Sequence, residues 1–278
     1  MLVTLNEILP LASASKGSIP CFNVFGFEDA SAIISAAEKL QQPVILATNK
    51  DMVEQLGVDV LAGMLLPMIA KSTASICLHL DHCYDEEVVY QAIHAGYSSV
   101  MFDGSQLSLS ENIRRTKQVV DVAHALGVSV EGEIGSVPYE EGRAHIKSIY
   151  TEPEEAARYA QESGLDCMAV AIGNIHRLST PSCTIDYDRL QKIEALVNVP
   201  LVVHGTSGIK EEDLYKLKET CVAKFNVGTS MRQAVGHNLR RLMQEEPDQY
   251  DRQYFFKKVM PYMQAEAERV ITLLAATR

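Results

Sequence analysis

Three ionisable side chains crowd one short stretch of the chain, His79-Leu80-Asp81-His82. The stretch ends an apolar run over 74–80 and precedes a polar turn, so we interpret it as the end of a buried strand. Burying such groups without partners costs roughly 2–7 kcal/mol for a polar group and more for a charge. The side chains therefore either form hydrogen bonds with one another in a purely structural role, or they face a cavity and take part in a reaction. The stretch alone leaves both interpretations open.

Short apolar segments alternate with helical segments along the 278 residues. We expect strands over 19–24, 43–47, 74–80, 99–102, 128–134, 167–172, 200–204 and 223–226. Such alternation predicts βαβ units and a parallel α/β sheet. Eight units favour a TIM (β/α)8 barrel over a doubly wound sheet, whose glycine fingerprint does not follow the first strand. We expect a single domain over 1–278, with a helical C-terminal extension over about 231–278, and helices capped by Asp29 and Ser110.

Polar side chains gather where the predicted strands end, which is where barrel active sites form. The residues expected there are Asn23, Asp81, His82, Asp103, Glu133, His176, His204 and Asn226. A lone histidine at a strand end is more often structural. Three histidines from three strands, with carboxylates nearby, match catalytic zinc, which takes three protein ligands and keeps one position open.

Two glycine-rich segments follow the last two predicted strands, Gly205-Thr206-Ser207-Gly208 and Gly228-Thr229-Ser230, and each leads into a helix. Backbone N–H groups at a helix N-terminus bind anions, and barrel phosphate sites often form after strands seven and eight. Each motif alone is ordinary loop chemistry. Together they indicate a phosphorylated substrate.

The composition restricts the partners and the compartment. A formal net charge of −11 argues against a nucleic-acid partner. No apolar run approaches 18 residues and the N-terminus lacks a signal-peptide pattern, so we expect no membrane span and no secretion. The six cysteines are scattered without a framework, which favours free thiols in a reducing compartment, the cytoplasm.

Six motifs follow one another along the chain: H-L-D-H-C, M-F-D-G-S, V-E-G-E-I-G, A-I-G-N-I-H, V-V-H-G-T-S-G and F-N-V-G-T. In this order they resemble the class II, zinc-dependent ketose-bisphosphate aldolases. The resemblance implies a TIM barrel with one catalytic Zn²⁺ per chain, often with a monovalent cation (Na⁺ or K⁺) near the phosphate. It also implies a homodimer or homotetramer.

The resemblance assigns roles residue by residue. His82, His176 and His204 would be the zinc ligands, and Glu133 would serve an alternate, buried metal position. Asp81 would be the acid/base at the substrate C4 hydroxyl, and Glu141 would move the proton on the dihydroxyacetone carbon. Substrate and phosphate binding would fall to Asn23, Gly205, Ser207, Asn226, Val227, Gly228 and Thr229.

Two departures from the family pattern affect the substrate. Arg177 stands where the family usually has glycine; it either contacts an acidic substrate group or points to solvent. The segment Tyr139-Glu140-Glu141-Gly142 replaces a Gly-Gly-Glu-rich run, so Glu140 competes with Glu141 for the acid/base role within an expected lid over 135–150. Asp103 is a further candidate site residue.

We therefore expect a zinc-dependent aldolase that cleaves a ketose 1,6-bisphosphate, fructose or tagatose, to dihydroxyacetone phosphate and glyceraldehyde 3-phosphate. One alternative is a class II aldolase for another phosphorylated sugar or sugar acid. The other is a non-catalytic barrel or binding protein.

Overall fold

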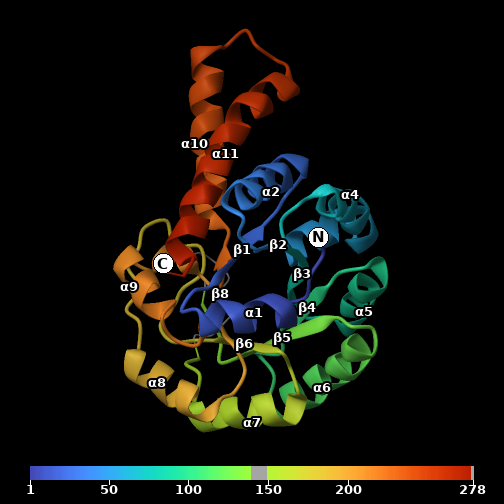
Figure 1. Ribbon diagram of the computed structural model, residues 1–278, viewed down its shortest axis with the longest axis vertical. Coiled ribbons are helices and arrows are strands. Elements are labelled where there is room, and N and C mark those ends of the chain that lie inside the picture. The colour runs from blue at the N-terminus through green and yellow to red at the C-terminus, as the bar shows by residue number, and fades with distance from the viewer. Residues whose placement is uncertain (139–148, 277–278) are drawn as a thin grey trace.

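Eight parallel strands close into a barrel, each pairing with the next and β8 with β1 (Figure 1). The computed structural model describes residues 1–138 and 149–276. The strands are β1 (Ile19–Asn23), β2 (Val44–Asn49), β3 (Ile76–Cys83), β4 (Ser99–Phe102), β5 (Ser129–Ile134), β6 (Cys167–Val170), β7 (Leu201–Val203) and β8 (Val222–Val227). Each predicted strand overlaps an observed one, so the predicted TIM barrel is confirmed.

An outer ring of helices alternates with the strands (Figure 1). These are α2 (Phe27–Leu40), α3 (Lys50–Leu56), α4 (Val58–Lys71), α5 (Glu86–Ala95), α6 (Leu109–Ala125), α7 (Pro153–Ser163), α8 (Tyr187–Leu196) and α9 (Glu211–Leu217). A short 3-10 turn, η1 (Thr206–Gly208), follows β7. The face that each helix turns to the sheet is apolar, as an amphipathic helix on a barrel requires.

Both predicted helix caps are wrong. The backbone of Gly26 caps α2, so Asp29 lies inside the first turn, where its carboxylate accepts a hydrogen bond from the Phe25 N–H at 3.1 Å. The hydroxyl of Ser108, two residues before Ser110, accepts from the Glu111 N–H and caps α6. In both cases the helix begins earlier than the apolar spacing indicates.

A helix that is not among the predicted elements, α1 (Leu5–Ala14), covers the end of the barrel where the strands begin (Figure 1). The Leu5 N–H donates to the hydroxyl of Ser129, the first residue of β5, at 3.0 Å. Leu5 and Leu9 belong to one buried apolar cluster with small interior side chains such as Cys21 and Ala47. Because α1 fills this end, the opening is left at the end where the strands finish.

Two helices follow the last strand, α10 (Thr229–Glu245) and α11 (Arg252–Leu274). They form a hairpin that projects beyond the barrel, and α11 packs along α2 (Figure 1). This confirms the predicted C-terminal helices, which begin at Thr229 rather than near 231.

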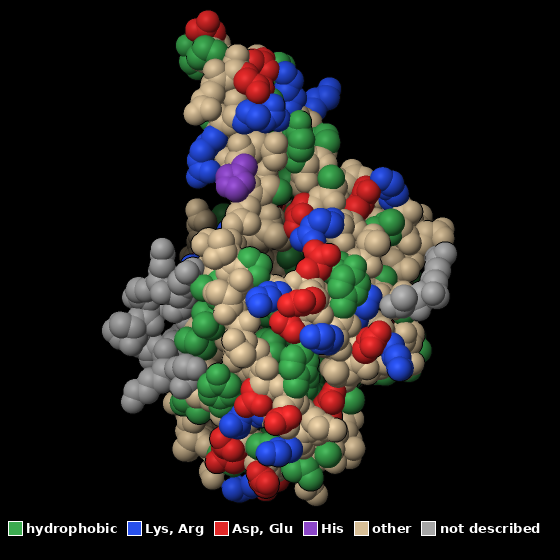
Figure 2. Space-filling view, turned by 90° about the vertical axis from the view of Figure 1, so that its left-hand side faces the viewer, with side chains coloured by type: hydrophobic (Ala, Val, Ile, Leu, Met, Phe, Trp, Pro, Cys, Tyr) green, Lys and Arg blue, Asp and Glu red, His purple; other side chains and the backbone are tan. Residues whose placement is uncertain are grey.

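On the face of the molecule drawn in Figure 2, acidic and basic side chains are interspersed and neither sign forms a separate patch. None of the six cysteines forms a disulfide, and five of them are buried.

Among the described residues, no single helix has the length and apolar content to cross a membrane. Only α3 and α4 taken together, bent by 105°, meet that test of length and composition.

Candidate active site

A bulge at the end of β3 brings two consecutive side chains to the barrel mouth. In a regular strand Asp81 and His82 would point to opposite faces. Here the pairing of β3 with β4 shifts register between Leu80 and Cys83, and His82 adopts a left-handed backbone with φ of 52°. A non-glycine residue in this region is uncommon and often marks a functional site. The bulge therefore lets both side chains face the same space.

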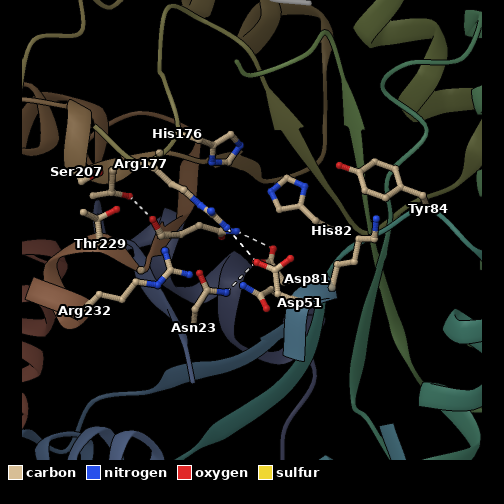
Figure 3. Close-up of a pocket in the computed structure, with 16 residues that line it drawn as sticks. Asn23, Asp51, Asp81, His82, Tyr84, His176, Arg177, Ser207, Thr229 and Arg232 are labelled. Carbon is tan, nitrogen blue, oxygen red and sulfur yellow. Dashed lines mark hydrogen bonds and ion pairs between the residues drawn. The ribbon is translucent and has the colours of Figure 1, made fainter. Parts of the chain in front are cut away.

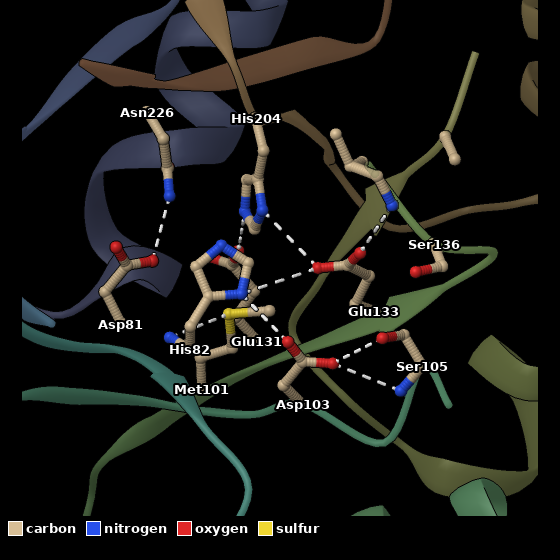
Figure 4. A network of polar contacts seen from close by, with 12 residues as sticks. Asp81, His82, Met101, Asp103, Ser105, Glu131, Glu133, Ser136, His204 and Asn226 are labelled. Carbon is tan, nitrogen blue, oxygen red and sulfur yellow. Dashed lines mark hydrogen bonds and ion pairs between the residues drawn. The ribbon is translucent and has the colours of Figure 1, made fainter. Parts of the chain in front are cut away.

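The carboxylate of Asp81 is held by two amides from neighbouring strands. The Asn23 side chain donates to one oxygen at 2.8 Å, and the Asn226 side chain donates to the other at 2.9 Å (Figures 3 and 4). Burial alone would raise the pKa of Asp81, but the charges of His82, His204 and Lys224 hold that pKa well below its usual range. Asp81 is thus an oriented, ionised carboxylate at the mouth.

The three predicted histidine ligands converge beside Asp81. Their ring centroids lie 4.5 Å apart for His82 and His204, 5.1 Å for His82 and His176, and 5.6 Å for His176 and His204. One nitrogen from each ring lies within 4.8 Å of one nitrogen of each other ring. The structure therefore brings together side chains from β3, from the segment after β6 and from the residue that follows β7.

Two of these imidazole rings are oriented by carboxylates that contact one nitrogen of each ring (Figure 4). His82 Nδ1 lies 2.8 Å from Asp103 Oδ2, and Asp103 is fixed in turn by the N–H and hydroxyl of Ser105. His204 Nε2 lies 2.9 Å from Glu131 Oε1. Metal-binding histidines commonly use their second nitrogen in this way. The arrangement leaves Nε2 of His82 and Nδ1 of His204 as the nitrogens that can bind a metal.

The negative charge around the three imidazole rings favours the binding of a divalent cation. Four carboxylates are buried around the rings, from Asp81, Asp103, Glu131 and Glu133. Nδ1 of His204 makes no hydrogen bond of good geometry within the described residues and lies 3.4 Å from Glu133 Oε2. Burial lowers the pKa of His176, which favours the neutral imidazole that metals require, whereas Glu131 and Glu133 raise the pKa of His204 against the effect of burial. The residues present therefore fit zinc, and His82, Asp103 and Glu133 form a second group that fits an alternate metal position.

A buried ion pair inside the barrel supports the site, and the sequence analysis missed it. Lys224 Nζ lies 2.8 Å from Glu131 Oε2 and donates to the Asn226 side chain at 2.6 Å. Lys224 thus contacts both the residue that orients His204 and the residue that holds Asp81. His79 also lies here: its Nδ1 is 2.8 Å from the Ser99 hydroxyl, and burial, with Lys224 nearby, lowers its pKa to about 4. His79 is a neutral, packed side chain.

The glycine-rich segments lie on the opposite wall of the same pocket from Tyr84 (Figure 3). Gly205 has φ of 71°, and a Cβ on it would lie 2.4 Å from the Ile175 carbonyl oxygen, so only glycine fits. Ser207, Gly228 and Thr229 line the pocket beside it. The Val227 side chain instead packs in the core, which leaves only its backbone for substrate.

The pocket also contains residues that the sequence analysis did not name: Asn49, Lys50, Asp51, Tyr84 and Arg232. Arg177 lines it too, with a partly exposed side chain that lies 3.2 Å from Asp51, so contact with substrate stays a prediction. Glu140 and Glu141 fall outside the described residues, and their predicted roles stay predictions.

A comparison of the whole chain with known protein families agrees with the geometry of the site. The family model described as fructose-bisphosphate aldolase class-II matches residues 3–278. The chain belongs to the class II fructose-bisphosphate aldolase family. This aldolase is therefore an enzyme, a carbon–carbon lyase, and the alternative of a non-catalytic barrel is set aside.

Solved structures of similar proteins cover almost all of this aldolase. The YdjI aldolase of Escherichia coli K12 is 30% identical, with 99% of this chain and 98% of that chain covered and a TM-score of 0.87. A putative fructose-1,6-biphosphate aldolase from Coccidioides immitis is 29% identical, with 96% and 94% covered and a TM-score of 0.84. A fructose-bisphosphate aldolase from Campylobacter jejuni, 23% identical with 98% and 95% covered and a TM-score of 0.84, shares the fold.

Proposed function

We propose that this aldolase is zinc-dependent and cleaves a ketose 1,6-bisphosphate, fructose or tagatose, to dihydroxyacetone phosphate and glyceraldehyde 3-phosphate. The observation that carries the proposal is the convergence of three imidazoles with an ionised carboxylate. Asp81 adjoins His82 in the chain, and His176 and His204 meet them at the mouth.

The side chains divide the work of a retro-aldol reaction. Asp81 accepts the proton of the C4 hydroxyl as the bond between C3 and C4 breaks, and Asn23 and Asn226 hold its two oxygens in position. Gly205, Ser207 and the first turn of α10 bind the phosphate of the ketose half through backbone N–H and hydroxyl groups.

His82, His176 and His204 would hold the zinc ion, with Asp103 and Glu131 orienting two of the rings. A bound zinc ion acts as a Lewis acid that stabilises the negative charge developing on the ketose half. Glu133 is proposed for the alternate metal position. Glu141, or Glu140 in its place, is proposed to move the proton on the dihydroxyacetone carbon. The monovalent cation and the homodimer or homotetramer also remain predictions.

A second candidate function is the aldol cleavage of another phosphorylated sugar or of a sugar acid. Arg177 favours it, because this cation lies in the pocket at a position where glycine is usual in the family.

A cleavage assay over phosphorylated ketoses separates the two candidates. Fructose 1,6-bisphosphate, tagatose 1,6-bisphosphate and ketose 1-phosphates ending in a hydroxyl or a carboxylate are compared by kcat/KM. Highest kcat/KM for one of the bisphosphates supports the first proposal. Preference for a 1-phosphate ending in a hydroxyl or a carboxylate supports the second, and no cleavage of any of them contradicts both.

A further inference from the structure

Three cationic side chains line the pocket and have no part in the proposed reaction: Lys50, Arg177 and Arg232. Arg177 and Lys50 both line the pocket, and Lys50 Nζ lies 5.6 Å from the centre of the Tyr84 ring. In Figure 3 Ser207 and Thr229 stand at one side of the pocket, Tyr84 stands at the other, and Asp81 and His82 lie between them. A substrate whose ketose phosphate is bound beside Ser207 therefore extends its other half toward Tyr84 and Lys50.

The backbone of Arg177 is in a conformation that favours glycine. Its φ is 60°, a left-handed value that non-glycine residues seldom adopt. The residue follows His176 directly, so its orientation is tied to the metal-binding side chains. A long cationic side chain at a strained position beside reacting groups indicates a functional use.

The guanidinium of Arg177 reaches across the pocket to α3. Its Nη2 lies 3.2 Å from Asp51 Oδ2, and the two side chains are 41% and 46% exposed (Figure 3). Exposed pairs of this kind contribute little to stability, because water screens them and their side chains lose rotamer freedom. Breaking this one contact between Arg177 and Asp51 to admit an anion therefore costs little free energy.

We propose that Arg177, assisted by Lys50, binds an anionic group at the far end of the aldehyde half of the substrate, and that Asp51 holds the guanidinium in place until this anion replaces it. The anion is a phosphate or a carboxylate. Arg177 is then a residue that determines specificity, and this inference rests on the proposed aldolase function.

The condensation reaction tests this inference. Dihydroxyacetone phosphate is combined with glyceraldehyde 3-phosphate, with succinic semialdehyde or with neutral glyceraldehyde, and kcat and KM are measured for each aldehyde. Arg177→Gln should lower kcat/KM for the preferred anionic aldehyde by about 10- to 100-fold, the effect of losing a hydrogen bond to a charged group, mainly through KM. Activity with glyceraldehyde should change less than twofold. The aldehyde that loses more identifies the anion as phosphate or carboxylate.

Further variants separate specificity from folding. Arg177→Gly suits the left-handed backbone and should lose the same discrimination, whereas Arg177→Lys should keep part of it. Asp51→Asn removes the competing carboxylate and should lower KM for the anionic aldehyde. Arg114→Gln, which breaks an exposed pair with Glu111 on α6, is the matched control and should change nothing.

Equal losses with neutral and anionic aldehydes, or no loss in Arg177→Gln and Arg177→Gly, would overturn the inference while leaving the aldolase function intact. Failure of the unmodified enzyme to form a carbon–carbon bond with all three aldehydes would instead overturn the proposed function and this inference with it.

Discussion

Replacing Asp81 with asparagine removes a buried negative charge and keeps the shape of the side chain. The alternative, Asp81→Ala, would leave the amide donors of Asn23 and Asn226 without this acceptor, at about 1–3 kcal/mol each. That sum, about 2–6 kcal/mol, is a large fraction of the total stability of many domains, which is about 5–15 kcal/mol. Asparagine keeps one acceptor oxygen, so the variant tests chemistry with less risk to the fold.

We expect Asp81→Asn to lower kcat about 10²–10⁴-fold, the usual contribution of a general acid or base, which is about 3–5 kcal/mol of activation free energy. KM and zinc content should stay close to those of the unmodified enzyme, because Asp81 is not among the proposed ligands. The assay is cleavage of the best ketose in the panel, with metal analysis of the same sample. Asp213→Asn, which alters the hydrogen bond from the Tyr187 hydroxyl on the outer ring, is a control that should keep kcat. A kcat for Asp81→Asn within threefold of the unmodified value would refute the acid/base role.

Two further predictions concern the surroundings of the site. Gly205→Ala should unfold at a lower temperature than Gly127→Ala. Both glycines have φ near 70°, a left-handed backbone that costs an alanine roughly 1–2 kcal/mol, but only at Gly205 would the added Cβ meet neighbouring backbone. Equal melting temperatures of the two variants would contradict the close approach of Gly205 to Ile175. Lys224→Met should lower the free energy of unfolding in urea by about 3–5 kcal/mol, because it leaves the fully buried Glu131 without its cation. The double variant Glu131→Gln/Lys224→Met should recover more than half of that loss, and a single variant as stable as the double would show that the pair does not matter.

The barrel and the position of its site follow from local patterns in the sequence. Apolar runs separated by helical segments predict eight parallel strands, and strand ends alone place His82, His176 and His204 at one mouth. These features depend on periodicity over a few residues. The family resemblance adds the chemistry that periodicity cannot supply.

Features that depend on contacts across the fold were missed. In the sequence Lys224 is a single polar residue within a predicted strand. Because its partner Glu131 is distant in sequence, no local pattern predicts the ion pair. The bulge at His82 contradicts strand alternation and needs the register of β4 to be recognised. Helix α1 had a local signal, the capping box of Thr4 and Glu7, but Pro10 within the helix weakens the helical pattern.

Metal content together with activity tests the central claim most directly. The purified enzyme is analysed for zinc per chain and assayed for cleavage before chelation, after chelation and after Zn²⁺ is restored, beside the variant His176→Ala. We expect one zinc per chain, loss of cleavage on chelation, recovery with Zn²⁺, and neither tightly bound zinc nor cleavage in His176→Ala. Full cleavage by a chelated, zinc-free sample would contradict the account.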